Sequence, residues 1–179
     1  IRHLEEALEF ENLVSITVED SMKIRMELAE AYLSLPCTKK SELVRNTNKA
    51  LNVIKPYLDV ISEDPKTNYV KSHILGKIAF RKNDFEESMN KYNEAFSFLE
   101  DINEGKPTSQ TANLYFEIGK VYSKQNLSST AGKYYQNAYD IFVSLNMLNQ
   151  ASVIEPLLPT DEEVDIFYDN DKNMEAITV

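Results

Sequence analysis

Side chains that could carry out acid–base, nucleophilic or metal chemistry are few in this sequence and stand far apart. The chain has two histidines, His3 and His73, and a single cysteine, Cys37. A zinc site needs several His or Cys ligands at short spacings, and a phosphate-binding loop needs clustered glycines. The sequence has neither arrangement and contains only four glycines. We therefore expect no catalytic residue, no metal and no cofactor, and the chain is predicted not to be an enzyme.

The charge of the chain limits its partners. Its formal net charge is −10 at pH 7, which disfavours direct binding to nucleic acid or to an anionic membrane. No apolar stretch reaches the roughly 18 residues that suggest a membrane span. The single cysteine cannot form an internal disulfide, and the N-terminus lacks the layout of a signal peptide. The sequence predicts an intracellular protein, cytoplasmic or nuclear, whose partner is another protein or peptide.

Positive charge gathers in one stretch of the chain and negative charge in another. Residues 66–83 contain five bases and no acid, namely Lys66, Lys71, Lys77, Arg81 and Lys82. Residues 156–179 carry seven acids and one base, a net charge of −6. An acid and its apolar or aromatic neighbours form a candidate ligand there, at Asp165, Ile166, Phe167 and Tyr168. This ligand could bind its own molecule or a neighbouring copy, which would allow self-association; the alternative is a solvated acidic arm.

The elements that must position these residues are predicted to be helices. Apolar residues recur every three or four positions and seldom alternate, and most prolines fall between the periodic segments. This pattern predicts an all-α fold with helices of about 15 to 20 residues. Pro56 is expected to end or kink a helix near Lys55. The expected N-caps are Thr67, Thr108 and Asp84, the last with Glu87 at capping-box spacing.

An internal repeat organises the predicted helices. Residues 75–96 align without a gap on residues 118–139, at a period of 43, and a fainter copy covers residues 28–51. In the two clear copies Gly76 matches Gly119, and Tyr92 matches Tyr135. We expect each of the three copies to form a hairpin of two helices. The small residue of the first helix would let the second helix approach closely.

The repeat resembles the tetratricopeptide repeat family. The family's small-residue, aromatic and alanine positions are matched by Gly76, Phe80, Tyr92 and Ala95, and by Gly119, Tyr122, Tyr135 and Ala138. The resemblance covers about residues 17–146, although the family's first tryptophan and final proline are missing. It implies a right-handed α-α superhelix of three hairpins over residues 17–158. A partial helix over residues 1–16 would precede it, a capping helix near Asn149 to Leu158 would close it, and an acidic, extended tail over residues 159–179 would follow.

In that family the first helix of each hairpin lines a concave groove. The resemblance therefore implies groove positions at Lys23, Met26, Glu30, Leu33, Val70, His73, Lys77, Phe80, Arg81, Asn113, Phe116, Lys120 and Lys124. Lys77 and Lys120 recur at the repeat period, as do Arg81 and Lys124, so two rows of positive charge are expected side by side. The implied function is an adaptor or scaffold that binds an acidic segment with apolar anchors.

Other interpretations of the same sequence stay open. The chain begins with Ile1 rather than methionine, so we expect it to be part of a longer protein. It could then be a peptide-sensing regulator whose output domain lies outside this sequence, or a structural subunit that uses the convex faces of its helices in a large assembly. The basic residues could also form a solvated helix face, as runs of charge commonly do.

Overall fold

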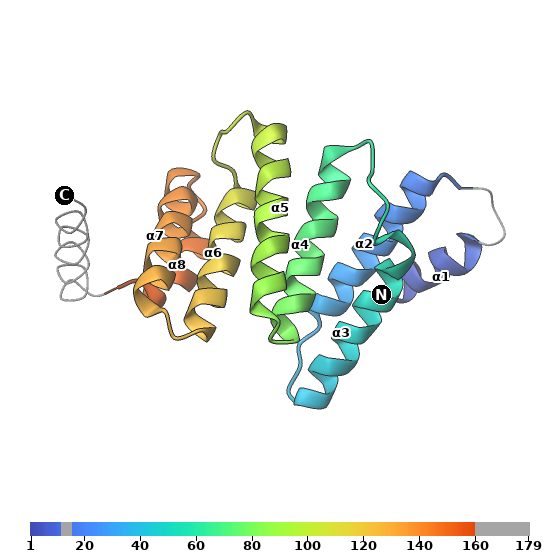
Figure 1. Cartoon of the computed structure of the whole chain (residues 1–179), viewed down its shortest axis with the longest axis horizontal. Coiled ribbons are helices and arrows are strands. Elements are labelled where there is room, and N and C mark those ends of the chain that lie inside the picture. Colours follow the sequence, from blue (N-terminus) through green and yellow to red (C-terminus); the bar gives the residue numbers. More distant parts are fainter. Residues whose placement is uncertain (12–15, 160–179) are drawn as a thin grey trace, which may run out of the picture. The chain divides into compact units, whose positions relative to one another are not determined.

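The structure, a computed structural model, describes residues 1–11 and 16–159 of the chain. These residues form eight α-helices and two short 3-10 turns, with no strand among them, which confirms the predicted all-α fold (Figure 1). The chain divides into two compact units between Lys106 and Pro107, and the predicted repeat domain over residues 17–158 stays a prediction. Just before that point Glu104 and Gly105 both adopt positive φ, 53° and 72°. The chain therefore turns out of the helical conformation there.

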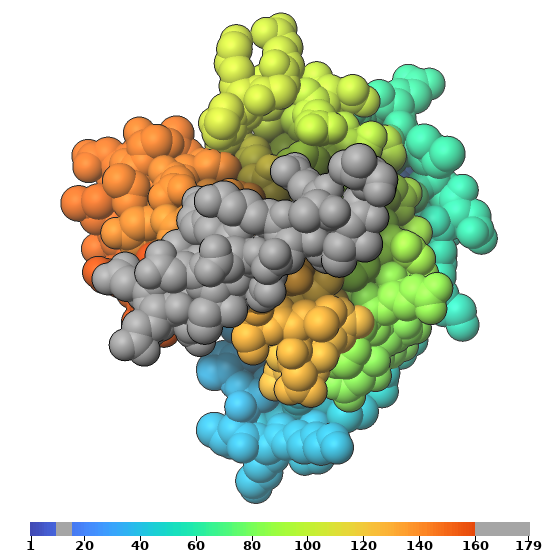
Figure 2. Space-filling model, turned by 60° about the vertical axis from the view of Figure 1, so that its left-hand side comes forward, coloured from blue at the N-terminus to red at the C-terminus, as the bar shows by residue number. Residues whose placement is uncertain are grey.

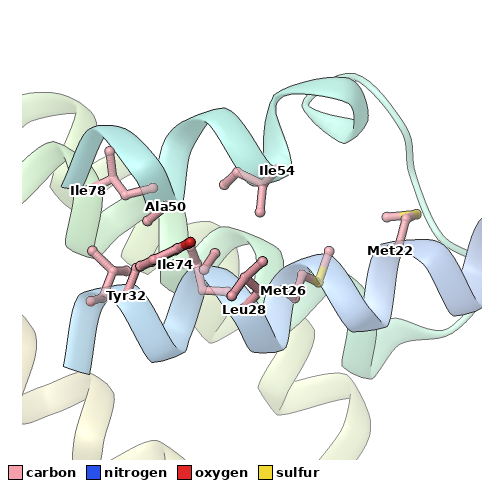
Figure 3. Close-up of a cluster of buried hydrophobic side chains, with 10 residues drawn as sticks. Met22, Met26, Leu28, Tyr32, Ala50, Ile54, Ile74 and Ile78 are labelled. Carbon is pink, nitrogen blue, oxygen red and sulfur yellow. The ribbon is translucent and has the colours of Figure 1, made fainter. Parts of the chain in front are cut away.

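The first unit contains a short helix and two hairpins. Its α-helices are α1 (Arg2–Glu11), α2 (Val18–Ser34), α3 (Lys40–Ile54), α4 (Pro65–Arg81) and α5 (Phe85–Asn103). α2 pairs with α3 and α4 pairs with α5, while α1 packs on α2 and α4 contacts both helices of the first hairpin. Figure 3 shows the core where α2, α3 and α4 meet, with buried side chains such as Met22, Leu28, Ile54 and Ile74.

The second unit is a hairpin covered at one end. α6 (Ser109–Lys124) pairs with α7 (Ser128–Ser144), and α8 (Leu148–Ile154) packs on α7. A capping helix is predicted near residues 149–158, and α8 lies there, followed by a 3-10 turn at Glu155–Leu157. The α-helix ends at this turn because Pro156 has no N–H to donate and its ring crowds the preceding turn. Buried alanines at the α6–α7 and α7–α8 contacts let these helices approach closely: Ala112, Ala131, Ala138 and Ala151.

Several helix ends lie where the sequence predicts them. Thr108 is the N-cap of α6, and its side chain accepts a hydrogen bond from the N–H three residues later. Asp84 caps α5 in the same way. α3 ends at Ile54, and the 3-10 turn that follows contains Pro56. These ends depend on local chemistry, so a sequence is sufficient to find them.

One predicted cap is wrong. Thr67 lies in the first turn of α4 and is buried, and its hydroxyl donates to the side chain of Asp64. The N-cap is Asp64, which accepts from the N–H of Lys66 at 3.0 Å. Pro65 then takes the first helical position, where its fixed φ is suitable and its missing N–H costs nothing. The helix therefore begins three residues earlier than a cap at Thr67 would allow.

The two clear repeats share the turn between their helices. Asn83 and Asn126 both have a φ of 61°, a left-handed conformation that asparagine adopts more readily than most residues. In both turns the next N–H donates to the carbonyl five positions earlier, at 3.0 Å. This hydrogen bond closes the end of the first helix. The repeat alignment thus predicts the backbone path as well as the buried side chains.

Each clear hairpin is held together by a tyrosine packed on a glycine. A Cβ placed on Gly76 would lie 2.5 Å from ring atoms of Tyr92, and one placed on Gly119 would lie 2.6 Å from Tyr135. Both distances are far below van der Waals contact, so no larger residue fits while the ring stays in place. This confirms the expected role of the small residue in the first helix of both hairpins.

Alanine substitutions at three glycines should distinguish the effect of this close packing on stability from the effect of helix propensity. We expect Gly76→Ala and Gly119→Ala each to lower the free energy of unfolding by about 1–3 kcal/mol through overpacking. Gly132→Ala is the matched control, because the atoms nearest to its Cβ would be those of Pro159, at 3.4 Å, an ordinary van der Waals distance. It should be neutral or stabilising by up to about 1 kcal/mol, the helix-propensity gain. Urea denaturation followed by circular dichroism measures all three, and equal stability of the three variants would refute the close fit.

Candidate functional site

A hollow between α2 and α4 of the first unit is the candidate site. It has a volume of about 410 Å³ and is lined by Lys23, Met26, Glu27, Glu30, Asp64, Lys66, Thr67 and Val70. We call it the α2–α4 hollow. Four of its lining residues, Lys23, Met26, Glu30 and Val70, are groove positions implied by the sequence. The other four, Glu27, Asp64, Lys66 and Thr67, are not among the implied groove positions.

The helical repeat explains how these side chains come together. On α2, positions 23, 26, 27 and 30 follow the three- and four-residue spacing of one helix face, and on α4 positions 66, 67 and 70 do the same. Met26 is buried, with 3% of its surface exposed, and Val70 is half-buried, so both form the apolar floor. Lys23, Glu27 and Lys66 are exposed and form a charged rim. A peptide side chain could be buried on this floor while its neighbours meet the rim.

The rim is not cationic. Lys23 Nζ lies 3.8 Å from an oxygen of Asp64 and 3.9 Å from one of Glu19. The hydrogen bond from the backbone N–H of Lys66 lowers the pKa of Asp64 below its usual value, and the charge of Lys23 acts in the same direction. The lining holds three carboxylates and two ammonium groups. An acidic ligand would therefore meet repulsion as well as attraction in this hollow.

Two of the expected groove cations already have partners inside the first unit. Lys77 Nζ donates to Glu30 at 2.6 Å, and the two side chains are 21% and 40% exposed. Arg81 donates to the backbone carbonyl of Leu33, in the last turn of α2. Carbonyls at that end of a helix lack intrahelical donors and carry the negative end of the helix dipole. Both cations therefore tie α4 to α2.

The remaining members of the basic stretch differ in exposure. Lys71 is buried and donates to the backbone carbonyls of Leu58 and Val60, and burial lowers the pKa of its ammonium group. Lys66 and Lys82 are exposed. The basic stretch at residues 66–83 therefore has some of its cations inside the unit and others on its surface.

The other expected groove residues of the first unit pack against aromatic rings or lie in the core. His73 lies between two tyrosines, with ring centroids 5.8 Å from Tyr69 and 6.0 Å from Tyr92. Phe80 packs on Phe85, 6.2 Å between centroids. Leu33 is buried. These side chains contribute to the packing of the hairpins, and none of them lines the α2–α4 hollow.

In the second unit the expected groove residues share one side of α6. Asn113 and Lys124 are exposed, and Phe116 packs on Tyr135 with ring centroids 5.8 Å apart. Lys120 Nζ is 2.6 Å from Glu117 and 5.3 Å from the centroid of the Phe116 ring. The expected rows that join Lys77 to Lys120 and Arg81 to Lys124 combine residues of different units, and they stay a prediction.

Two further expectations concern the ligand and other kinds of site. The candidate tail ligand, Asp165, Ile166, Phe167 and Tyr168, lies outside the described residues. In residues 1–11 and 16–159 no three His, Cys, Asp or Glu side chains are grouped so that they could hold a metal ion. Cys37 is a half-buried free thiol that contacts the Leu35 carbonyl and the Asn46 amide. Of the helices in the described part of the chain, none combines the length and apolarity that crossing a membrane requires.

Three of the four hollow residues that were not expected groove positions have a common origin. Asp64, Lys66 and Thr67 belong to the cap and first turn of α4. The misplaced cap at Thr67 hid them, and the Asp-Pro pair at residues 64–65 was the signal that would have found them.

Comparisons with protein-family models, with curated proteins and with solved structures found no match to this chain.

Proposed function

We propose that this chain is a protein-interaction module, an adaptor or scaffold of the tetratricopeptide-like kind, that binds a segment of another protein in the α2–α4 hollow. The observation that carries this proposal is the hollow itself, with an apolar floor at Met26 and Val70 inside a rim of charged side chains. Its volume of about 410 Å³ falls within the range of ligand pockets, about 300–1,000 Å³. It suits one or two anchoring side chains of a peptide.

The chemistry of the rim defines the partner segment. An aliphatic or aromatic anchor would be buried on the floor, which is where interfaces gain most of their affinity. Both signs of charge line the rim, with Glu27 and Lys66 exposed. We therefore infer a segment with an apolar anchor flanked by both acidic and basic residues, in place of the acidic segment with apolar anchors that the sequence alone favours. Charged rim contacts would set its register and orientation.

A selection from random peptides tests this proposal. The parent chain should enrich peptides that share one apolar residue between charged ones. Those peptides should bind at least tenfold more weakly to Glu27→Trp, because an indole at this exposed lining position would occupy the hollow. Glu86→Trp places the same side chain at an exposed position on α5, away from the hollow, and should bind them like the parent. Fluorescence anisotropy measures both affinities.

Two outcomes of that experiment would reject the proposal. One is that the parent chain enriches no peptide family. The other is that the enriched peptides bind equally well to the parent and to Glu27→Trp. Circular dichroism of both tryptophan variants should match the parent, since neither position is buried.

A further inference from the structure

The outward side of α3, in the first unit, carries exposed basic and amide side chains. They border a shallow depression of about 720 Å³ and recur at spacings of three and four residues, which places them along one side of the helix. They include Lys40, Val44, Arg45, Asn48, Lys49 and Asn52. We call this surface the α3 cationic face. Figure 2 shows the turn before α3, in light blue, standing out from the surface at the lower edge of the view.

The charge of this stretch is opposite to that of the chain. Residues 39–55 hold five bases and one acid, a net charge of +4, whereas the whole chain carries −10. Within the described part of the chain, no carboxylate forms an ion pair with Lys40, Arg45 or Lys49. The one acid, Glu42, is held at the start of the helix, where it accepts from the backbone N–H groups of residues 38 and 39. The positive charge of the face is therefore available to a partner.

The α3 cationic face differs from the other basic surfaces of the first unit. Lys77 is paired with Glu30, and Arg81 is bound to the Leu33 carbonyl. The lining of the α2–α4 hollow holds both signs of charge. On α3 the exposed cations have no such partner among the described residues. The electrostatic environment that suits an acidic ligand is therefore on α3, and the hollow would repel part of the same ligand.

An apolar side chain lies among these cations. Val44 is 48% exposed, one helical turn after Lys40 and directly before Arg45. Asn48 follows one turn later, and its amide can both donate and accept hydrogen bonds. Covering an exposed apolar side chain contributes affinity, while the charges around it set the register and the choice of partner. The face thus offers a small apolar contact surrounded by positive charge.

We propose that the α3 cationic face is a second binding surface, which takes an acidic segment of another protein with one apolar residue among its acids. Carboxylates pair with Lys40, Arg45 and Lys49, and the apolar residue covers Val44. Along the helix axis, successive cations are roughly 7.5 Å and 6 Å apart. Side chains on one side of an extended chain repeat at roughly 6.5 Å. An extended segment with acids at alternate positions therefore matches the spacing of the cations.

A protein segment suits this face better than a nucleic acid does. The distance from Lys40 to Lys49 along the helix axis is roughly 14 Å, so the face can contact few phosphates. Nucleic-acid binding depends on many phosphate contacts, and the net charge of −10 would repel a polyanion that extends beyond the face. A short acidic segment places its few carboxylates on the face alone.

Fluorescence anisotropy of a labelled peptide with the full chain tests this proposal. In the probe, glutamate alternates with serine, and leucine replaces the central glutamate. Arg45→Glu should weaken its binding by about tenfold or more, and Arg45→Lys should retain it. Lys82→Glu is the matched control, because it makes the same change of net charge at an exposed lysine outside the face, and it should bind like the parent. High salt, about 1 M, should abolish binding, since the screening length falls to about 3 Å.

A second pair of changes tests the contact with Val44. Val44→Ser should weaken binding of the leucine probe by about two- to tenfold. A probe with serine in place of leucine should bind the parent and Val44→Ser equally, because the contact is already absent. Val44, Arg45 and Lys82 are all exposed, so circular dichroism of their variants should match the parent.

Several outcomes would overturn the proposal. If the probe does not bind, or binds equally to Arg45→Glu and Lys82→Glu, the face is only a solvated helix surface. Tighter binding of an oligothymidylate with the same number of charges, or of phosphatidylserine vesicles, would show that the ligand is not a protein. Glu27→Trp occupies the α2–α4 hollow and should leave probe binding unchanged. Loss of binding in that variant would place the acidic peptide in the hollow and remove the second surface.

Discussion

Replacing Tyr92 by alanine is expected to lower the free energy of unfolding by about 3–5 kcal/mol, the range for deleting a large buried aromatic side chain. Tyr92 lies on α5 with 0% of its surface exposed and is one of the largest fully buried side chains among the described residues. Its ring covers Gly76 of α4, so its removal opens a cavity between the two helices of the hairpin. A loss of that size is a large fraction of the stability of a typical domain.

The measurement is chemical denaturation of the parent, Tyr92→Ala and the exposed neighbour Asn93→Ala. The control should change stability by no more than about 0.5 kcal/mol, as is usual for surface positions. The double variant Gly76→Ala/Tyr92→Ala should lose less than the sum of the two single variants, because the new methyl group enters the space that the ring has left. Strictly additive losses would mean that Gly76 and Tyr92 do not share this space.

Alkali is expected to unfold the protein between about pH 10 and pH 12 through its buried tyrosines. Burial raises the pKa of Tyr69 to about 12, and the charge of Glu30 adds to this effect. Burial likewise raises the pKa of Tyr32 to about 12, and the hydrogen bond that its hydroxyl donates to Glu5 contributes further. Above pH 10 the unfolded chain releases these protons while the folded chain still retains them.

The sign of the pH effect follows from those protons. A raised pKa in the folded state gives a stabilisation that is complete below pH 10, the ordinary value for tyrosine, and that disappears as the pH rises through 12. For Tyr69, which is 9% exposed, a shift from 10 to about 12 corresponds to about 2–3 kcal/mol. Lys71 acts in the opposite direction. Burial lowers the pKa of its ammonium group, so the folded chain releases this proton at a lower pH than the unfolded chain does. The contribution of Lys71 to stability therefore increases as the pH rises.

Denaturation curves at a series of pH values from 9 to 12 measure this effect. Tyr69→Phe and Tyr32→Phe should each flatten the decline in stability, whatever they do to stability at neutral pH. If both variants decline with the same slope as the parent, these two tyrosines do not control alkaline unfolding. Absorbance at the tyrosinate band should show the same two groups titrating late in the folded chain.

The sequence by itself determined the helices, several of their ends and the packing inside each clear hairpin. Periodic apolar residues define helices, and Pro56 ends α3 because a proline cannot continue the hydrogen-bonded ladder. The repeat of 43 residues placed Gly76 against Tyr92 and Gly119 against Tyr135 correctly. These features depend on residues close in the chain or repeated at a fixed period. Their physical causes, steric fit and local hydrogen bonding, are therefore visible in the sequence.

The tertiary structure alone decided which cations are available at the surface. Glu30 and the Leu33 carbonyl, the partners of Lys77 and Arg81, lie 47 and 48 residues away, so no local pattern could reveal that these charges are engaged. The same holds for Lys71, whose burial depends on the path of the chain after α3. The electrostatic character of a surface depends on long-range pairing, and a one-dimensional charge pattern does not contain that information.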